Sequence, residues 1–283
     1  MVPAVSGTAA GTMFGNMCFP TICRKTSDDV ELAMSRVIDV AIERSDGDQR
    51  AADRDRVVVE APLQLRARGV PVATIMRTPG HDLELVRGLL HAEAIAPCAA
   101  RQDGEDGVEL ETDEAAFARR GLLASAACGV CGRAAIADLE TRAKSVASDA
   151  GTTLAVIATL PEKLRAAQQV FDDTGGLHAA ALFTLEGERV AVREDVGRHN
   201  AVDKLVGWAL DARVDPTRHL LFLSGRAGYE LVQKAIMFGV PIVASVSAPS
   251  SLAIELAERF NVSLVGFVRG NRANVYAHGW RLR

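Results

Sequence analysis

Short apolar runs alternate with amphipathic segments through the second half of the chain, and this alternation constrains the fold more than any other feature. Runs rich in branched and aromatic residues span 220–223, 241–246 and 264–268, and helical patterns over 229–238 and 250–260 separate them. Strands joined through helices pair in parallel with right-handed crossovers, and unbroken apolar runs suit strands that are covered on both faces. We therefore expect a three-layer α/β/α domain.

A hairpin over 177–193 and a helix over 199–210 precede these elements, so the full order resembles the cytidine deaminase fold. Zinc deaminases carry H-x-E at the start of one helix and P-C-x-x-C at the start of the next. The corresponding positions here read His199-Asn200-Ala201 and Ser224-Gly225-Arg226-Ala227. Two thiolates and the general acid are missing, so we expect neither deamination nor a bound metal.

The first half of the chain predicts a smaller mixed α+β domain behind an N-terminal extension. A hairpin is expected over 57–76, followed by a helix over 81–96. Apolar residues at helical spacing predict a helix over 28–44, and the polar run 45–56 is typical of a linker. The expected organisation is an extension with one amphipathic helix and a linker (1–55), a small α+β domain (56–120), a cysteine loop with the following helix (121–149) and a cytidine deaminase-like α/β domain (150–283).

Charge, hydropathy and cysteine content exclude several classes of protein. The chain has 32 basic and 36 acidic residues, a net charge of −4, so no general positive field exists to hold nucleic acid. Five cysteines in 283 residues are too few for a disulfide scaffold, and the odd number favours a reducing compartment. Glycines and Pro20 interrupt the uncharged start of the chain, so we expect no signal peptide, no membrane span and a cytoplasmic location.

Cys128 and Cys131 lie in the most informative stretch, a loop of small residues between the two halves. Gly129 follows Cys128 and Gly132 follows Cys131, and both glycines permit tight bends. A helix is expected from 134 to 147. Unpaired backbone N–H groups and the helix dipole stabilise a thiolate at a helix start, and Arg133 adds a positive charge. The loop is therefore a candidate nucleophilic sulfur site.

A single C-x-x-C motif leaves three other interpretations open. One is half of a four-ligand zinc site, whose other half would be Cys18 and Cys23. Another is a thioredoxin-like redox pair, although such pairs begin the helix of a βαβ unit. The third is an inert turn of small residues.

Three further segments place basic and small residues where helices begin or strands end. The stretches 193–204 and 224–226 lie at helix starts, and helix N-termini favour phosphate groups. The stretch Phe267-Val268-Arg269-Gly270-Asn271-Arg272 carries two arginines that suit a pyrophosphate, and its Phe267 could stack on a base. The alternatives are a structural ion-pair network at 193–204 and a solvated hairpin at 267–272.

Several long motifs occur together in one order along the chain. They are Arg77-Thr-Pro-Gly-His-Asp82, 89–95, Cys128-Gly-Val-Cys131-Gly132, Thr174-Gly-Gly-Leu-His178-Ala-Ala, Arg193-Glu-Asp-Val-Gly-Arg-His-Asn-Ala-Val-Asp-Lys204, Ser224-Gly-Arg226, Ala248-Pro-Ser-Ser-Leu252 and Gly266-Phe-Val-Arg269. This set resembles the formate dehydrogenase accessory sulfurtransferases, the FdhD family. The resemblance runs from about residue 56 to the C-terminus, and Gly228 stands where that family is expected to have serine.

The resemblance implies a sulfurtransferase with a cysteine persulfide intermediate. Such proteins take sulfur from a cysteine desulfurase and deliver it to the bis-molybdopterin guanine dinucleotide form of the molybdenum cofactor, before its insertion into formate dehydrogenase. Cys128 would then carry the persulfide, and Cys131 would assist or resolve its transfer.

The resemblance also implies a homodimer, whose two copies hold the two nucleotide arms of the bound molybdenum cofactor. GDP would mimic one arm in part. The cofactor-binding residues implied in this way are His178, His199, Lys204, Ser224, Arg226, Phe267, Val268, Arg269, Gly270, Asn271 and Arg272.

Two functions of other classes stay open. A thiol-disulfide oxidoreductase would show a dithiol redox potential and reductase turnover. A molybdenum-cofactor-binding chaperone with a structural C-x-x-C would still support formate dehydrogenase after Cys128→Ala.

Overall fold

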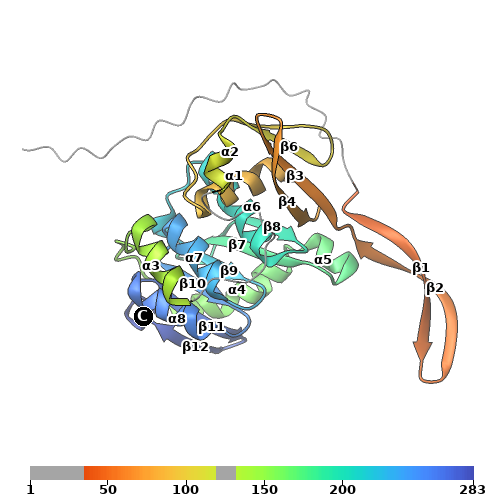
Figure 1. Cartoon of the computed structure of the whole chain (residues 1–283). Coiled ribbons are helices and arrows are strands. Elements are labelled where there is room, and N and C mark those ends of the chain that lie inside the picture. Colours follow the sequence, from red (N-terminus) through yellow and green to blue (C-terminus); the bar gives the residue numbers. More distant parts are fainter. Residues whose placement is uncertain (1–34, 119–131) are drawn as a thin grey trace, which may run out of the picture.

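The computed structural model describes residues 35–118 and 132–283, which form two sheets with their helices and a projecting hairpin (Figure 1). The larger sheet has the strand order β12-β11-β10-β9-β7-β8. Its central strands β9, β10 and β11 are parallel, whereas β7, β8 and β12 join by antiparallel pairing. The strands are β7 (His178–Thr184), β8 (Arg189–Asp195), β9 (His219–Leu223), β10 (Ile242–Ser245), β11 (Ser263–Arg269) and β12 (Arg272–Ala277).

Helices cover both faces of this sheet because its strands are apolar on both sides. Leu182 and Leu221 pack into a cluster with the helices of one face, and Phe183, Leu220 and Phe222 face the other. Each large apolar side chain buried in this way contributes about 1.5–3 kcal/mol. The first face carries α6 (Arg198–Asp211), α7 (Tyr229–Phe238) and α8 (Ser251–Arg259), and the second carries α4 (Leu154–Arg165).

The expected α/β class is confirmed. The three expected helices α6, α7 and α8 lie together on one face of the sheet, and α4 covers the other face. The relation to the cytidine deaminase fold stays a prediction. Helix α7 has the predicted bounds, whereas α4, α5 (Gln169–Thr174) and β12 were not predicted. Two 3-10 helices complete this half, η1 (Pro216–Arg218) and η2 (Gly279–Arg281).

The smaller sheet lies beside the larger one and has the order β4-β3-β6-β5. Helix α1 covers it, and Leu63, Leu65 and Leu85 form its fully buried core. The predicted mixture of strands and helices in this half is present, although the domain boundaries themselves stay predictions. The elements are β3 (Ala61–Ala67), β4 (Val70–Arg77), α1 (Asp82–Ala92), β5 (Ala100–Gln102), β6 (Gly107–Leu110) and α2 (Glu114–Ala118), and α3 (Gly132–Arg142) follows.

Helices α1 and α6 join the two sheets through direct contact of their backbones. A Cβ atom added to Gly88 would lie 1.9 Å from the carbonyl oxygen of Asp203. A Cβ atom added to Gly207 would lie 1.9 Å from the carbonyl oxygen of Glu84. Real Cβ atoms do not approach so closely, so only glycine permits this helix spacing at either position.

The segment before the smaller sheet forms a β-hairpin, and our prediction of a helix over 28–44 is wrong for its described part. Strands β1 (Val37–Asp46) and β2 (Gln49–Val58) pair along their full length, so the expected linker at 45–56 is mostly strand. Ile38, Val40 and Ile42 recur with the period of two that a strand requires. Cross-strand pairing with β2, including the 2.6 Å ion pair of Arg44 with Asp53, outweighs the weak helical periodicity.

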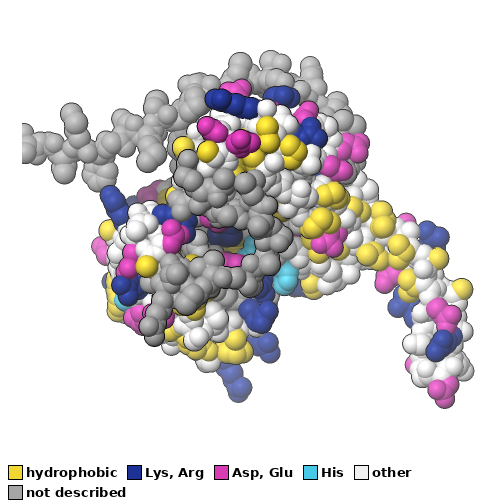
Figure 2. All heavy atoms as spheres, viewed as in Figure 1, with side chains coloured by type: hydrophobic (Ala, Val, Ile, Leu, Met, Phe, Trp, Pro, Cys, Tyr) yellow, Lys and Arg dark blue, Asp and Glu magenta, His cyan; other side chains and the backbone are white. Residues whose placement is uncertain are grey.

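The hairpin extends away from the two sheets, with apolar side chains near its base and charged side chains toward its tip (Figure 2). Gly47, at a φ of 59°, supplies the left-handed backbone that its two-residue turn needs. No helix within the described ranges is long and apolar enough to cross a membrane.

Candidate functional site

Most of the predicted binding residues lie along one edge of the larger sheet, the edge formed by the ends of its strands. Strands β9, β10 and β11 end at this edge, and the antiparallel strands β7 and β12 begin there. The edge therefore brings together His178, the Ser224–Arg226 turn and the turn between β11 and β12. The carboxyl ends of parallel strands are where open α/β sheets bind ligands.

Cys128 and Cys131 lie outside the described residues, as do Cys18 and Cys23. Helix α3 begins at Gly132, the residue that follows Cys131 in the sequence, two residues earlier than predicted. The zinc, redox and persulfide interpretations of the C-x-x-C motif therefore stay predictions. Cys98 is half-buried, and burial raises the pKa of its thiol, which disfavours a reactive thiolate there.

His178 lies over the turn that follows β9. A Cβ atom added to Gly225 would lie 3.2 Å from Nδ1 of His178, so glycine provides the space for the imidazole. The Ser224 hydroxyl accepts a hydrogen bond of 2.8 Å from the backbone N–H of Ala179, which fixes the turn against β7. Burial lowers the pKa of His178, and the nearby charge of Arg198 lowers it further. His178 is therefore a neutral hydrogen-bonding group at pH 7.

His199 and Glu230 join the first turns of α6 and α7 at the same edge. Their side chains meet with 2.6 Å between Nε2 and Oε2, and both are partly exposed. The hydrogen bond from His199 lowers the pKa of the Glu230 carboxyl. Sequence reasoning missed Glu230, because an acidic residue in the first turn is ordinary for any helix.

Lys204, predicted as a cofactor contact, is buried inside the protein. Its ammonium group lies 2.7 Å from Oδ2 of Asp195 and donates a 2.7 Å hydrogen bond to the Thr78 carbonyl oxygen. The side chains of Lys204 and Asp195 have no exposed surface. Burial lowers the pKa of Lys204, and the carboxylate of Asp195 opposes this shift. These contacts assign Lys204 to holding the smaller domain against α6 rather than to contacting a ligand.

Two other charges of the 193–204 stretch are also paired. Arg193 connects β8 to α1 of the smaller domain, whereas Asp203 connects α6 to α7 on one face of the larger sheet. Arg193 makes two hydrogen bonds to Glu84, of 2.6 and 2.8 Å, and Lys234 pairs with the buried Asp203 at 2.8 Å. The structural ion-pair network, which the sequence left as an alternative, is therefore present. A buried pair of this kind fixes geometry, and removing one partner leaves a costly unpaired charge.

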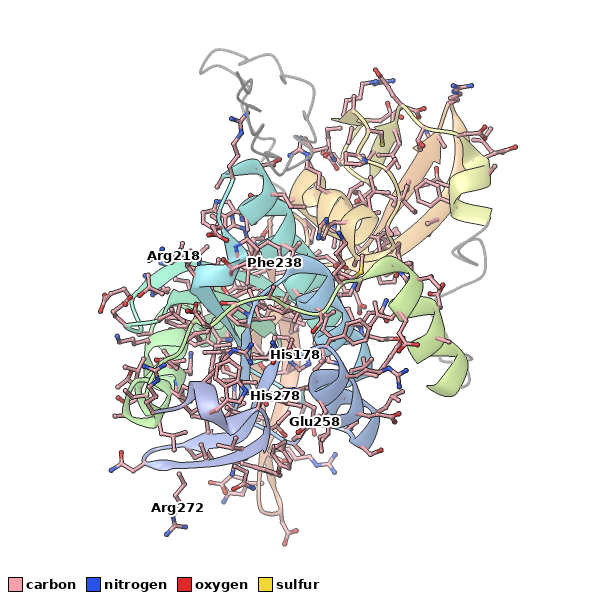
Figure 3. All side chains as sticks on the ribbon, turned by 90° about the vertical axis from the view of Figure 1, so that its left-hand side faces the viewer. His178, Arg218, Phe238, Glu258, Arg272 and His278 are labelled. Atoms are coloured by element: carbon pink, nitrogen blue, oxygen red, sulfur yellow. The ribbon has the colours of Figure 1, made fainter. Side chains whose placement is uncertain are left out.

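The turn between β11 and β12 presents an aromatic ring and two arginines to solvent. Phe267 sits at a β-bulge with a φ of 52°, and 40% of its surface is exposed. Its backbone N–H donates a 3.2 Å hydrogen bond to the Ser247 carbonyl oxygen, which holds the bulge against the loop after β10. Arg269 and Arg272 are exposed, and Figure 3 shows Arg272 extending from the body of the protein.

The remaining residues of this turn have different roles. The side chain of Val268 is fully buried against the α4 face, so only its backbone is available to a ligand. Gly270 has a φ of 49°, which closes the turn, and Asn271 is exposed. The positive φ of Phe267 at this bulge strains the backbone locally, and other contacts must compensate for the strain. Such strain is often found at functional positions.

The chain is similar to proteins of one family. A model described as the FdhD/NarQ family matches residues 58–283. The sulfur carrier protein FdhD of Sulfolobus acidocaldarius is 48% identical over 241 residues, which cover 82% of this chain and 93% of that protein. The protein with the same name from Nocardia farcinica is 46% identical over 253 residues, covering 81% of this chain and 89% of the relative.

A solved structure has the same fold. The crystal structure of a putative formate dehydrogenase accessory protein from Desulfotalea psychrophila superposes with a TM-score of 0.72. The match covers 88% of this chain and 100% of that one at 22% identity.

Proposed function

The chain belongs to the FdhD/NarQ family, and we propose from this that it is a sulfur carrier that serves a formate dehydrogenase. The observation that carries the proposal is the match over residues 58–283, which includes Cys128 and Cys131. Curated relatives of 46–48% identity are named as sulfur carriers. A carrier needs a nucleophilic thiol, and the C-x-x-C motif is the one place in the sequence with two closely spaced thiols besides Cys18 and Cys23.

The proposed reaction is a transfer of sulfane sulfur without net oxidation. The Cys128 thiolate attacks the terminal sulfur of a persulfide on a cysteine desulfurase, and the cysteine thiolate of the donor leaves. Cys128 then holds the persulfide, and Cys131 assists or resolves its onward transfer.

The proposed acceptor is the bis-molybdopterin guanine dinucleotide cofactor, bound as a substrate at the carboxyl edge of the larger sheet. Arg269 and Arg272 are exposed guanidinium groups suited to the pyrophosphate, and Phe267 offers an exposed ring for a guanine base. The turn also presents the backbone of 268 and 270 and the side chain of Asn271. GDP should bind to the same turn as a partial mimic.

The residues around the turn after β9 complete the proposed binding edge. Arg226 is exposed there, and His178 is a neutral donor or acceptor next to Ser224. His199, held by Glu230, lies at the start of α6. We further propose a cytoplasmic homodimer, in which the two copies bind the two guanine nucleotide arms.

Intact-mass measurement after incubation with a cysteine desulfurase and cysteine tests the carrier function. We expect a gain of one sulfur atom in the unmodified chain and in Cys98→Ser, a matched control whose thiol is half-buried. The gain should be lost in Cys128→Ser. A gain that survives removal of both Cys128 and Cys131 would contradict the proposal, as would disulfide reductase turnover without any gain.

A further inference from the structure

The β1–β2 hairpin has an open side along each of its two strands, and the proposed sulfur and cofactor chemistry uses neither. Within the described residues, β1 and β2 form a separate sheet in which each strand pairs with the other alone. At ten residues each, they are also the longest strands in the described parts of the chain. The open side of a strand presents unpaired backbone N–H and C=O groups, and a two-stranded hairpin is marginally stable in water. A third strand along one side would therefore stabilise the hairpin.

Alternate residues of β1 direct their backbone groups to its open side. The N–H of Val59 donates a 2.9 Å hydrogen bond to the carbonyl oxygen of Arg36, and the register of β1 and β2 continues this pair without a shift. In an antiparallel ladder the hydrogen-bonded pairs recur at every second residue. Residues 38, 40 and 42 therefore bond to β2. The residues whose backbone groups point outward are Val37, Asp39, Ala41 and Glu43.

The side chains of β1 make one of its faces apolar and the other acidic. Three branched residues share the first face: Ile38, Val40 and Ile42. Of these, Ile38 has 49% of its surface exposed. Asp39 and Glu43 lie on the other face, where Glu43 pairs with Arg50 at 3.2 Å and Asp39 has no ion pair within the described residues. A strand that binds here should therefore be apolar on one face and should place a basic residue opposite Asp39.

A second copy of β1 does not supply this basic residue. A two-fold axis through the hairpin sheet keeps each side chain on the same face in both copies, so an antiparallel pair of β1 strands is centred on one residue. The registers that pair Asp39 along most of β1 set it opposite Ala41, Glu43 or Ser45 of the partner subunit. None of these three residues is basic. Charge complementarity therefore favours a partner other than a second β1 strand.

The other strand of the hairpin is a less suitable site. Helix α5 lies against β2 near the base of the hairpin, and Arg56 pairs with Asp173 of α5 at 2.7 Å. Pairing of β2 with β1 of another copy would be a head-to-tail contact, which continues from hairpin to hairpin into an open filament. The open side of β1 is therefore the one available to a partner.

We propose that the open side of β1 binds an extended segment of a partner protein in which apolar and basic residues alternate. The segment would add a third strand, and its backbone would pair with the outward N–H and C=O groups of residues 37–43. Its apolar side chains would lie beside those of 38, 40 and 42, and a lysine or arginine would lie beside Asp39. The hairpin projects away from the larger sheet, so this surface is separate from the proposed cofactor edge (Figure 1).

Binding of a fluorescein-labelled octapeptide of alternating valine and lysine to the full chain, measured by fluorescence anisotropy, tests this surface. We expect saturable binding. A peptide of the same composition, with its valines and lysines in two blocks, should bind about ten-fold more weakly or worse. The block peptide has the same charge, so it reports general attraction to an acidic chain. Equal affinities for the two peptides, or the absence of saturable binding, would overturn the proposal.

Ala41→Pro and Ala52→Pro are a matched pair of variants on the two open sides. Proline removes an outward N–H from β1 in the first and from β2 in the second, and neither N–H belongs to the ladder between the strands. Ala41→Pro should weaken binding of the alternating peptide by about ten-fold or more, whereas Ala52→Pro should leave it unchanged. An equal effect of the two substitutions would contradict the assignment to β1.

Asp39→Asn leaves the backbone of the hairpin intact and so tests the charge separately. It should weaken binding of the valine–lysine peptide and not that of a valine–serine peptide, and equal changes for both would overturn the role of Asp39. Sedimentation velocity of the full chain without peptide tests a second copy as the occupant. A dimer or filament that Ala41→Pro disperses would overturn the proposal of a different partner. The sulfur gain measured by intact mass does not depend on any of these results.

Discussion

Lys204 Nζ lies 2.7 Å from Oδ2 of Asp195, and neither side chain has any surface exposed to solvent. The pair connects α6 to the end of β8, and the hydrogen bonds of both groups with Thr78 extend it to the smaller domain. Lys204, which the sequence offered as a cofactor contact, thus helps to hold the frame on which the proposed binding edge is built.

Lys204→Met should destabilise the protein by about 3–5 kcal/mol, because it leaves Asp195 as an uncompensated buried charge. Urea unfolding followed by circular dichroism measures the change. Lys144→Met, at an exposed lysine, is the matched control and should change stability by less than about 0.5 kcal/mol. GDP affinity of folded Lys204→Met should match that of the unmodified chain, and a selective loss of affinity would restore Lys204 as a ligand contact.

Gly88→Ala should cost about 3 kcal/mol or more, because the added Cβ atom would lie 1.9 Å from the Asp203 carbonyl oxygen and α1 would have to move. This loss is net of the better helix propensity of alanine, about 1 kcal/mol. Gly228→Ala is the control, since a Cβ atom there meets nothing within 4 Å. Similar unfolding midpoints for the two variants would contradict the close contact of α1 and α6.

Stability should fall in acid through Glu84. Burial raises the pKa of its carboxyl, but the hydrogen bonds from Arg193 and His81 outweigh this and lower the pKa from 4.5 to about 2. Because the folded-state pKa is lowered, the stabilisation is complete above the ordinary pKa and is lost as the pH falls from about 4.5 toward 2.

The free energy of unfolding, measured at several pH values between 7 and 3, checks this expectation. Glu84→Gln should be less stable at neutral pH and should show a shallower loss in acid than the unmodified chain. Glu60→Gln, at an exposed carboxyl, should keep the full acid dependence. Identical pH profiles for the unmodified chain and Glu84→Gln would refute the assignment.

Arg269→Ala and Arg272→Ala should each weaken GDP binding by about ten-fold or more, because each removes a charge-assisted hydrogen bond worth about 1.5–3 kcal/mol. Calorimetric titration measures the affinities. Arg218→Ala is the matched control, because Arg218 is also exposed but lies before β9, at the end of that strand opposite to the proposed binding edge. Figure 3 shows Arg218 and Arg272 far apart. An equal loss in all three variants would point to general electrostatic attraction instead of a site.

The parallel core could be predicted because its signals are local and strong. The strand at 242–245 and the helix at 229–238 combine apolar runs with clear boundaries at Gly239 and Pro241. The hairpin at 37–58 was missed, because the strand-like alternation of apolar residues is confined to β1, whereas β2 is polar over most of its length and is stabilised by pairing with β1. Spacing of apolar residues alone does not reveal such cross-strand partners.

That several candidate binding residues lie together could be predicted in part, for a similar reason. The exposed turn at 267–272 follows a buried strand, and that local transition is visible in the sequence. The role of Lys204 depends on Thr78, 126 residues away, and no local signal connects the two. Long-range hydrogen bonds of this kind become visible only when the elements are placed together.

The contact of Gly88 and Gly207 with the opposing backbones has a consequence for how the chain unfolds. Helix α1 belongs to the smaller sheet and α6 to the larger one, yet neither can detach without exposing the surface that the other covers. The two sheets should therefore form one cooperative unit and melt in a single transition. Separately expressed halves would each expose the apolar helix face that the other half covers. We therefore expect neither half to be stable alone, although each has its own sheet.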